Sequence, residues 1–123
     1  MMHNKPKYTL FKNTTYALSG LVDVVKHEPS FRLQILLFIA GNIVAWNLPI
    51  EISYTFVLSI SLLIPIMAEI ANSAIERVVD LVTKDYHILA KQAKDAGAAL
   101  VFVSLVTLAA IWLSTLALAF ELI

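Results

Sequence analysis

The sequence predicts an all-α membrane protein, with an amphipathic N-terminal surface helix followed by three transmembrane helices. Hydrophobic residues make up 59% of the 123-residue chain and charged residues 15%, against roughly half and roughly a quarter in soluble domains. Three uncharged runs, at 33–50, 52–68 and 96–120, hold 18, 17 and 25 residues, and a spanning helix needs about 20. A chain of this length forms one domain, so we expect a single helical bundle over 1–123.

The distribution of charge predicts the orientation in the membrane. All nine lysines and arginines lie before the first uncharged run or between the second and the third. Because positive residues stay on the cytoplasmic side, the N-terminus is expected in the cytoplasm and the C-terminus on the opposite side. The chain contains no cysteine, which excludes a disulfide framework and a thiolate metal site.

The first expected element is a surface helix over 7–26. Its apolar residues recur at helical spacing and alternate with polar ones, the pattern of a helix lying in the membrane interface. A soluble helix packed on a partner is the alternative. The apolar positions are Leu10, Phe11, Leu18, Leu21, Val22 and Val25.

Three longer helices follow, over 29–48, 53–82 and 94–120. Pro29 suits the first turn of a helix, and Trp46 suits an interfacial anchor before the outer turn. Pro65 predicts a kink above Glu69. The polar residues 83–95 read as a link, and the small residues 97–99 permit close helix packing or are ordinary helix residues.

One face of the 53–82 helix concentrates polar groups. At 3.6 residues per turn, five side chains fall on this face: Glu69, Asn72, Ser73, Glu76 and Asp80. Ionisable groups inside a membrane helix mark functional sites, and carboxylates at this spacing suit Mg²⁺ ligation or proton transfer. Two positions stay open: Asn72 orients a substrate or joins helices, and Asp80 pairs with Arg77 or Lys84, or faces water.

Further candidates come from other segments. Glu28 precedes a helix, where the helix dipole stabilises an acidic side chain. Its alternative role is to supply a second carboxylate to a metal bound by Glu76. Lys94 is a candidate phosphate ligand or a snorkelling lysine, and Asp95 is a candidate helix cap or partner of Lys94. The three glycines are too far apart for a phosphate-binding loop. No basic tract for nucleic acid is present.

Four motifs occur in order: ExxFR at 28–32, EIANSAIERVVD at 69–80, DYH at 85–87 and AKDAGAA at 93–99. With this spacing, the chain closely resembles the prokaryotic integral-membrane diacylglycerol kinases from residue 16 to residue 112. The undecaprenol kinases of Gram-positive bacteria share most of these motifs. The resemblance implies a homotrimer in the bacterial inner membrane, with a periplasmic C-terminus and active sites between subunits at the cytoplasmic surface.

The resemblance also implies residue roles. Glu69 matches the catalytic base, and Glu28 and Glu76 match the ligands of Mg²⁺ and ATP. Lys94 matches a phosphate contact that Asp95 supports. Further nucleotide contacts match Tyr16, Asp85, Tyr86 and His87. The lipid-binding region matches residues 13–18 and 30–34. The residues expected to contact the lipid are Asn13, Ser30, Phe31, Arg32, Gln34, Glu69, Asn72, Ala98 and Trp112.

Three positions depart from the family pattern. Thr9 stands where an arginine that contacts phosphates is often found, for which Lys7 or Lys12 is a possible substitute. Asp85 replaces a more usual glutamate, and Gln34 replaces an acid of some relatives.

The expected function is an ATP- and Mg²⁺-dependent kinase that converts 1,2-diacylglycerol to phosphatidic acid and ADP. Undecaprenol kinase is the nearest alternative, because the motifs are shared. A small proton-coupled transporter explains only Glu69, and a non-catalytic membrane subunit explains none of the acids.

Overall fold

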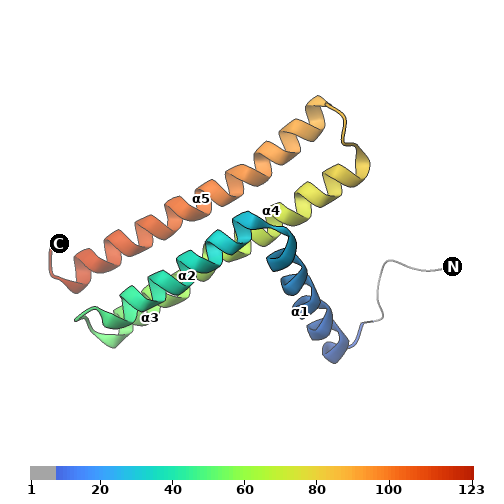
Figure 1. Ribbon diagram of the computed structural model, residues 1–123. Helices are drawn as coiled ribbons and strands as arrows, with labels where there is room; N and C mark the ends of the chain where they lie inside the picture. Colours follow the sequence, from blue (N-terminus) through green and yellow to red (C-terminus); the bar gives the residue numbers. More distant parts are fainter. Residues whose placement is uncertain (1–7) are drawn as a thin grey trace.

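In the computed structural model, which describes residues 8–123, the chain folds into five helices joined by short links (Figure 1). They are α1 (Leu10–His27), α2 (Pro29–Asn47), α3 (Ile52–Ser61), α4 (Leu63–Val82) and α5 (Ile88–Ala119). Residue 7, where the first helix was expected to begin, lies outside the described part.

Three helical segments are long and apolar enough to cross a membrane, as the sequence predicted. They are α2, the consecutive helices α3 and α4, and α5, with mean hydropathies of 1.3, 1.8 and 2.3. The second and third segments hold 31 and 32 residues, whereas about 20 span the hydrocarbon layer. Each of these two segments is therefore longer than the hydrocarbon layer requires.

The three segments run side by side, whereas α1 leaves the bundle at a steep angle (Figure 1). Helix α4 packs most extensively on α5 and more lightly on α2. Val24 is the single buried residue of α1, so this helix has little contact with the rest of its own chain. That α1 lies on a membrane surface stays a prediction.

The corner between α1 and α2 is built by Glu28 and Pro29. The N–H of Glu28 donates to the carbonyl of Val24 at 2.9 Å and ends α1. The extended backbone of Glu28 (φ −115°, ψ 101°) is the conformation that a following proline favours. Pro29 occupies the first turn of α2, where its missing N–H costs nothing.

The long central segment breaks at Leu62, between α3 and α4, rather than at Pro65 itself. Proline lacks the N–H that would bond to the carbonyl four residues earlier, and its ring clashes with that carbonyl. The disturbance therefore falls in the turn before Pro65. The hydroxyl of Ser61 donates to the carbonyl of Leu58 at 2.6 Å in this turn.

Helix α5 begins at Ile88, six residues before the expected start at 94. The ring nitrogen Nδ1 of His87 accepts a hydrogen bond from the N–H of Leu89 at 3.1 Å and caps the helix. The link between α4 and α5 is therefore only 83–87. Asp95 lies inside α5, so its expected role as a cap is wrong.

Candidate functional site

Glu69 is a buried carboxylate on α4 that faces the start of α2. Its residue is 5% exposed, and Oε1 accepts a hydrogen bond from the hydroxyl of Ser30 at 2.6 Å. Burying a carboxylate is costly unless a partner offsets the lost hydration. The described structure gives Glu69 one neutral partner, which is the setting of a group that can exchange a proton with a hydroxyl.

Asn72 lies one turn further along α4 and faces α5. Its amide nitrogen donates to Oε1 of Glu76 at 3.4 Å, whereas its buried oxygen Oδ1 has no hydrogen-bond partner in the structure. Gly97 of α5 is buried against it, and a Cβ at position 97 would collide with Oδ1 of Asn72. The expected close helix approach at Gly97 is thus confirmed.

Glu28 does not cap α2 with its side chain, which reaches α4 instead. Its Oε1 accepts from the hydroxyl of Ser73 at 2.9 Å and from Nε and Nη2 of Arg77 at 3.4 and 3.3 Å. Arg77 also pairs with Asp23 of α1. The hydrogen bond from Arg77, followed by the weaker influence of His27, holds the pKa of Asp23 below its ordinary value of 3.8.

This network corrects one expectation and adds two residues to the site. Arg77, offered as a partner for Asp80, instead ties the α1–α2 corner to α4. Ser73 and Arg77 are four residues apart and therefore share a helix face. That spacing was readable in the sequence, but their contact with Glu28 depends on how α2 packs on α4.

The residues expected to bind a metal are carboxylates that contribute oxygen ligands. Within residues 8–123, no three His, Cys, Asp or Glu side chains gather into a group that could hold a metal ion. Magnesium is usually held by one or two carboxylates together with substrate phosphates and waters. Glu28 and Glu76 fit that chemistry as a donor set, and their joint ligation stays a prediction.

A second polar region lies between the end of α4 and the start of α5, around a cavity of about 370 Å³. It is lined by most residues expected to contact nucleotide, namely Asp85, Tyr86, His87, Lys94 and Asp95. Nζ of Lys94 lies 2.7 Å from Oδ1 of Asp80, and Nζ of Lys91 lies 2.6 Å from Oδ2 of Asp95. The structure therefore pairs Lys94 with Asp80 and gives Asp95 a different lysine.

The expected lipid contacts on α2 have separate surroundings. Phe31 is buried, with 2% exposed. Arg32 donates to the carbonyls of Val25 and Lys26 at 3.4 and 3.3 Å, at the end of α1. Gln34 follows Ser30 by one turn, and its buried Oε1 has no hydrogen-bond partner in the structure. Gln34 and Asn72 thus place two unpartnered buried oxygens on the helices that carry Ser30 and Glu69.

Three other residues expected in the site are exposed in the single chain. Asn13 and Tyr16 are exposed on α1, and Ala98 is exposed on α5. Thr9, the position of the missing arginine, accepts from the N–H of Lys12 at 3.1 Å and caps α1.

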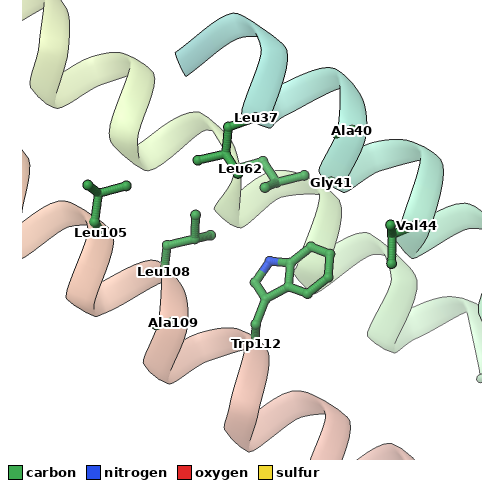
Figure 2. A pocket seen from close by; sticks show the side chains of 9 residues that line it. All are labelled: Leu37, Ala40, Gly41, Val44, Leu62, Leu105, Leu108, Ala109 and Trp112. Carbon is green, nitrogen blue, oxygen red and sulfur yellow. The ribbon is translucent and has the colours of Figure 1, made fainter. Parts of the chain in front are cut away.

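Trp112 lines an apolar groove of about 480 Å³ between α5, α2 and the α3–α4 junction (Figure 2). Its indole N–H donates to the hydroxyl of Ser61 at 3.1 Å. Gly41 of α2 borders the same groove, and a Cβ there would approach Leu62 to 2.7 Å. The groove is separate from the residues around Glu69, so a shared lipid site for Trp112 and Glu69 stays a prediction.

Known proteins resemble this chain over most of its length. The family model for prokaryotic diacylglycerol kinase matches residues 15–116. The diacylglycerol kinase of Haemophilus influenzae is 35% identical over 105 residues, which cover 84% of this chain and 87% of that protein. The diacylglycerol kinase of Pseudomonas aeruginosa is 34% identical over 84% of both chains. That of Escherichia coli K12 is 30% identical over 91% of this chain and 93% of its own.

The family match covers the part of the chain that forms the helices and the polar clusters described above. The matched region runs from the middle of α1 almost to the end of α5 and includes the face of α4 that carries Glu69. The chain belongs to the prokaryotic diacylglycerol kinase family, whose members are phosphotransferases with an alcohol acceptor.

Proposed function

We propose that this protein is an ATP- and Mg²⁺-dependent kinase that phosphorylates the free hydroxyl of 1,2-diacylglycerol, giving phosphatidic acid and ADP. The family and the names of its relatives support the activity and the lipid. The observation that carries the proposal is the 2.6 Å hydrogen bond from the Ser30 hydroxyl to the buried carboxylate of Glu69. A substrate hydroxyl that takes the place of this donor is positioned to lose its proton to Glu69.

In the proposed reaction, Glu69 accepts the proton as the lipid oxygen forms a bond to the γ-phosphorus of ATP. The bond between that phosphorus and the oxygen bridging it to the β-phosphate breaks, and ADP leaves. A reaction of this kind depends mainly on positioning and on neutralising phosphate charge. Bound Mg²⁺ would neutralise part of that charge. Glu28 and Glu76 would hold it, and Lys94 would contact the phosphates.

Three features favour a polar lipid headgroup close to Glu69. Within residues 8–123, the buried oxygens of Gln34 and Asn72 have no hydrogen-bond partner, whereas buried polar groups in proteins normally have one. The first turn of α2 carries three of the expected lipid contacts, Ser30, Phe31 and Arg32. The apolar lengths of α2 and α4 then continue from this point, so acyl chains can extend beside them into the bilayer.

The proposal includes an assembly and a place. We place the protein in the bacterial inner membrane as a multi-pass homotrimer, with a cytoplasmic N-terminus and a periplasmic C-terminus. Large apolar residues on every spanning segment are exposed in the single chain, such as Leu33 of α2 at 67%, Met67 of α4 at 67% and Phe102 of α5 at 68%. Lipid or neighbouring subunits must cover such surfaces.

A direct assay separates diacylglycerol kinase from undecaprenol kinase. Purified protein in mixed micelles is given Mg²⁺ and γ-³²P-labelled ATP with either dioleoylglycerol or undecaprenol at equal mole fraction, and the lipid products are separated. We expect the label in phosphatidic acid. Label confined to undecaprenyl phosphate would assign the other lipid, and no labelled lipid with either acceptor would contradict kinase function.

A further inference from the structure

The pair of Asp80 and Lys94 joins two helices at the wall of the polar cavity. Asp80 lies in the last turn of α4, and Lys94 lies near the start of α5. Nζ of Lys94 donates to Oδ1 of Asp80 at 2.7 Å. The same cavity is lined by Tyr86 and His87. The ion pair therefore fixes the position of the Lys94 ammonium in the region where nucleotide contacts are expected.

The other acid near this lysine serves a different partner. Oδ2 of Asp95 accepts from Nζ of Lys91 at 2.6 Å, one turn apart on α5 itself. This pair lies within a single helix and does not cross to α4. The support for Lys94 that the sequence led us to expect from Asp95 thus comes from Asp80.

The chemistry of lysine explains what this support accomplishes. A lysine ammonium is a point charge on a flexible four-carbon stem, with three N–H donors. The structure shows one contact from Lys94 to a single oxygen of Asp80, so two donors remain for phosphate oxygens. A pair as exposed as this one, at 42% and 44%, adds little to folding stability. Its effect falls on the position of the ammonium.

We propose that Asp80 is a positioning residue for nucleotide binding, which holds the Lys94 ammonium at the cavity wall ready to receive the phosphates of ATP. This inference rests on the proposed kinase function and names a residue on which that function depends. Asp80 touches neither substrate in the proposal, because it acts through Lys94.

The test compares Asp80→Ala, Asp80→Asn, Lys94→Ala and the double variant Asp80→Ala/Lys94→Ala. For each, KM and kcat are measured with Mg-ATP and dioleoylglycerol, and the Kd for Mg-ADP is measured by calorimetry. Ordering one long side chain corresponds to about two- to tenfold in affinity. We expect Asp80→Ala to raise KM for Mg-ATP and Kd for Mg-ADP by that factor, with kcat and the lipid KM unchanged. Asp80→Asn keeps an acceptor oxygen and should recover most of the loss.

The double variant separates positioning from a structural role. If Asp80 acts through Lys94, removing Asp80 has no further effect once the lysine is absent. As a matched control, Glu51→Ala removes an exposed carboxylate that precedes α3, whereas Asp80 lies near the end of α4, and this change should leave every constant unchanged.

Three results would overturn the inference. An equal loss from Asp80→Ala with and without Lys94 would assign Asp80 a structural role. Unchanged nucleotide constants in Asp80→Ala, beside an active wild type, would refute the positioning role and leave the kinase proposal intact. A wild type that neither binds Mg-ADP nor transfers phosphate would contradict both.

Discussion

Two glutamates of the site differ in the partners that the fold gives them. Glu69 is buried and accepts from the neutral hydroxyl of Ser30. Glu28 accepts from the guanidinium of Arg77 and from Ser73. Environments that differ in this way commonly give two carboxylates different tasks. We accordingly propose proton transfer for Glu69 and metal ligation for Glu28, together with Glu76.

Replacing Glu76 by Gln tests the metal role at the residue scale. Glutamine keeps an oxygen that can accept from Asn72 but loses the charge that attracts Mg²⁺. We expect the KM for Mg-ATP to rise on the order of tenfold or more, with part of the activity recovered at high Mg²⁺. The measurement is initial rate against ATP at several Mg²⁺ concentrations, with Glu51→Gln as the control. A loss of rate with an unchanged Mg²⁺ dependence would speak against ligation.

At the scale of elements, α4 and α5 approach each other closely at one small residue. Gly97 is buried where Asn72 reaches α5, and no space exists there for a Cβ. Because Asn72 is also bonded to Glu76, the helix approach and the polar face of α4 are coupled. A shift of either helix moves the site.

Gly97→Ala and Gly20→Ala form a matched pair of variants. Alanine at 97 collides with Asn72, whereas a Cβ at 20 meets nothing within 4 Å. We expect Gly97→Ala to reduce kcat/KM by about tenfold or more, because it displaces the Asn72 amide. Gly20→Ala should preserve activity and raise the helicity of α1, since alanine favours a helix over glycine by about 1 kcal/mol. Equal activity of the two variants would mean that the contact at Gly97 does not matter for catalysis.

The elements also show what the sequence could predict. Hydropathy located the three spanning segments, Pro29 marked the start of α2, and helical periodicity identified the face that carries Glu69. The early start of α5 was missed because residues 88–93 form a helix outside the apolar run, where hydropathy carries no signal. The His87 cap that begins this helix was not recognised either.

The side-chain partners could not be read from the sequence for a different reason. Arg77 and Lys94 each had several acids within reach along the chain. The pairing of Arg77 with Asp23 and Glu28, and of Lys94 with Asp80, depends on the distance between helices. Periodicity assigns a residue to a face of its own helix, but the packing of α2 and α5 against α4 decides which residues of other helices meet that face.

At the scale of the whole molecule, a single chain leaves much of its apolar surface uncovered. Helix α1 leaves the bundle at a steep angle (Figure 1), and its residues Asn13 and Tyr16 are exposed. In the proposed homotrimer, neighbouring chains cover spanning helices and bring further residues to each site. Such an arrangement would explain why some residues expected in the site do not lie together within one chain.

Mixing two inactive chains tests whether sites are shared. Glu69→Gln and Glu28→Gln chains are unfolded, mixed and reconstituted together into bilayers. Within one chain, Glu28 already contacts Ser73 of α4 and Ser30 contacts Glu69, so the test asks whether the proposed trimer combines the Glu69 of one subunit with the Glu28 of another. If it does, some mixed trimers contain a site with both residues intact. We expect activity to return to the fraction that random assembly gives. Mixtures that stay inactive, although crosslinking shows mixed trimers, would mean that each chain builds its own site.

The central claim, that Glu69 is the base for phosphoryl transfer to a lipid hydroxyl, is tested most directly by single-turnover kinetics of Glu69→Gln. Glutamine keeps an acceptor for Ser30 and removes the proton acceptor, and loss of a general base typically slows the chemical step by about 10² to 10⁴. The account predicts a slowing of this size at saturating Mg-ATP and dioleoylglycerol, with the Kd for Mg-ADP unchanged. Transfer at the wild-type rate, with nucleotide binding intact, would contradict it.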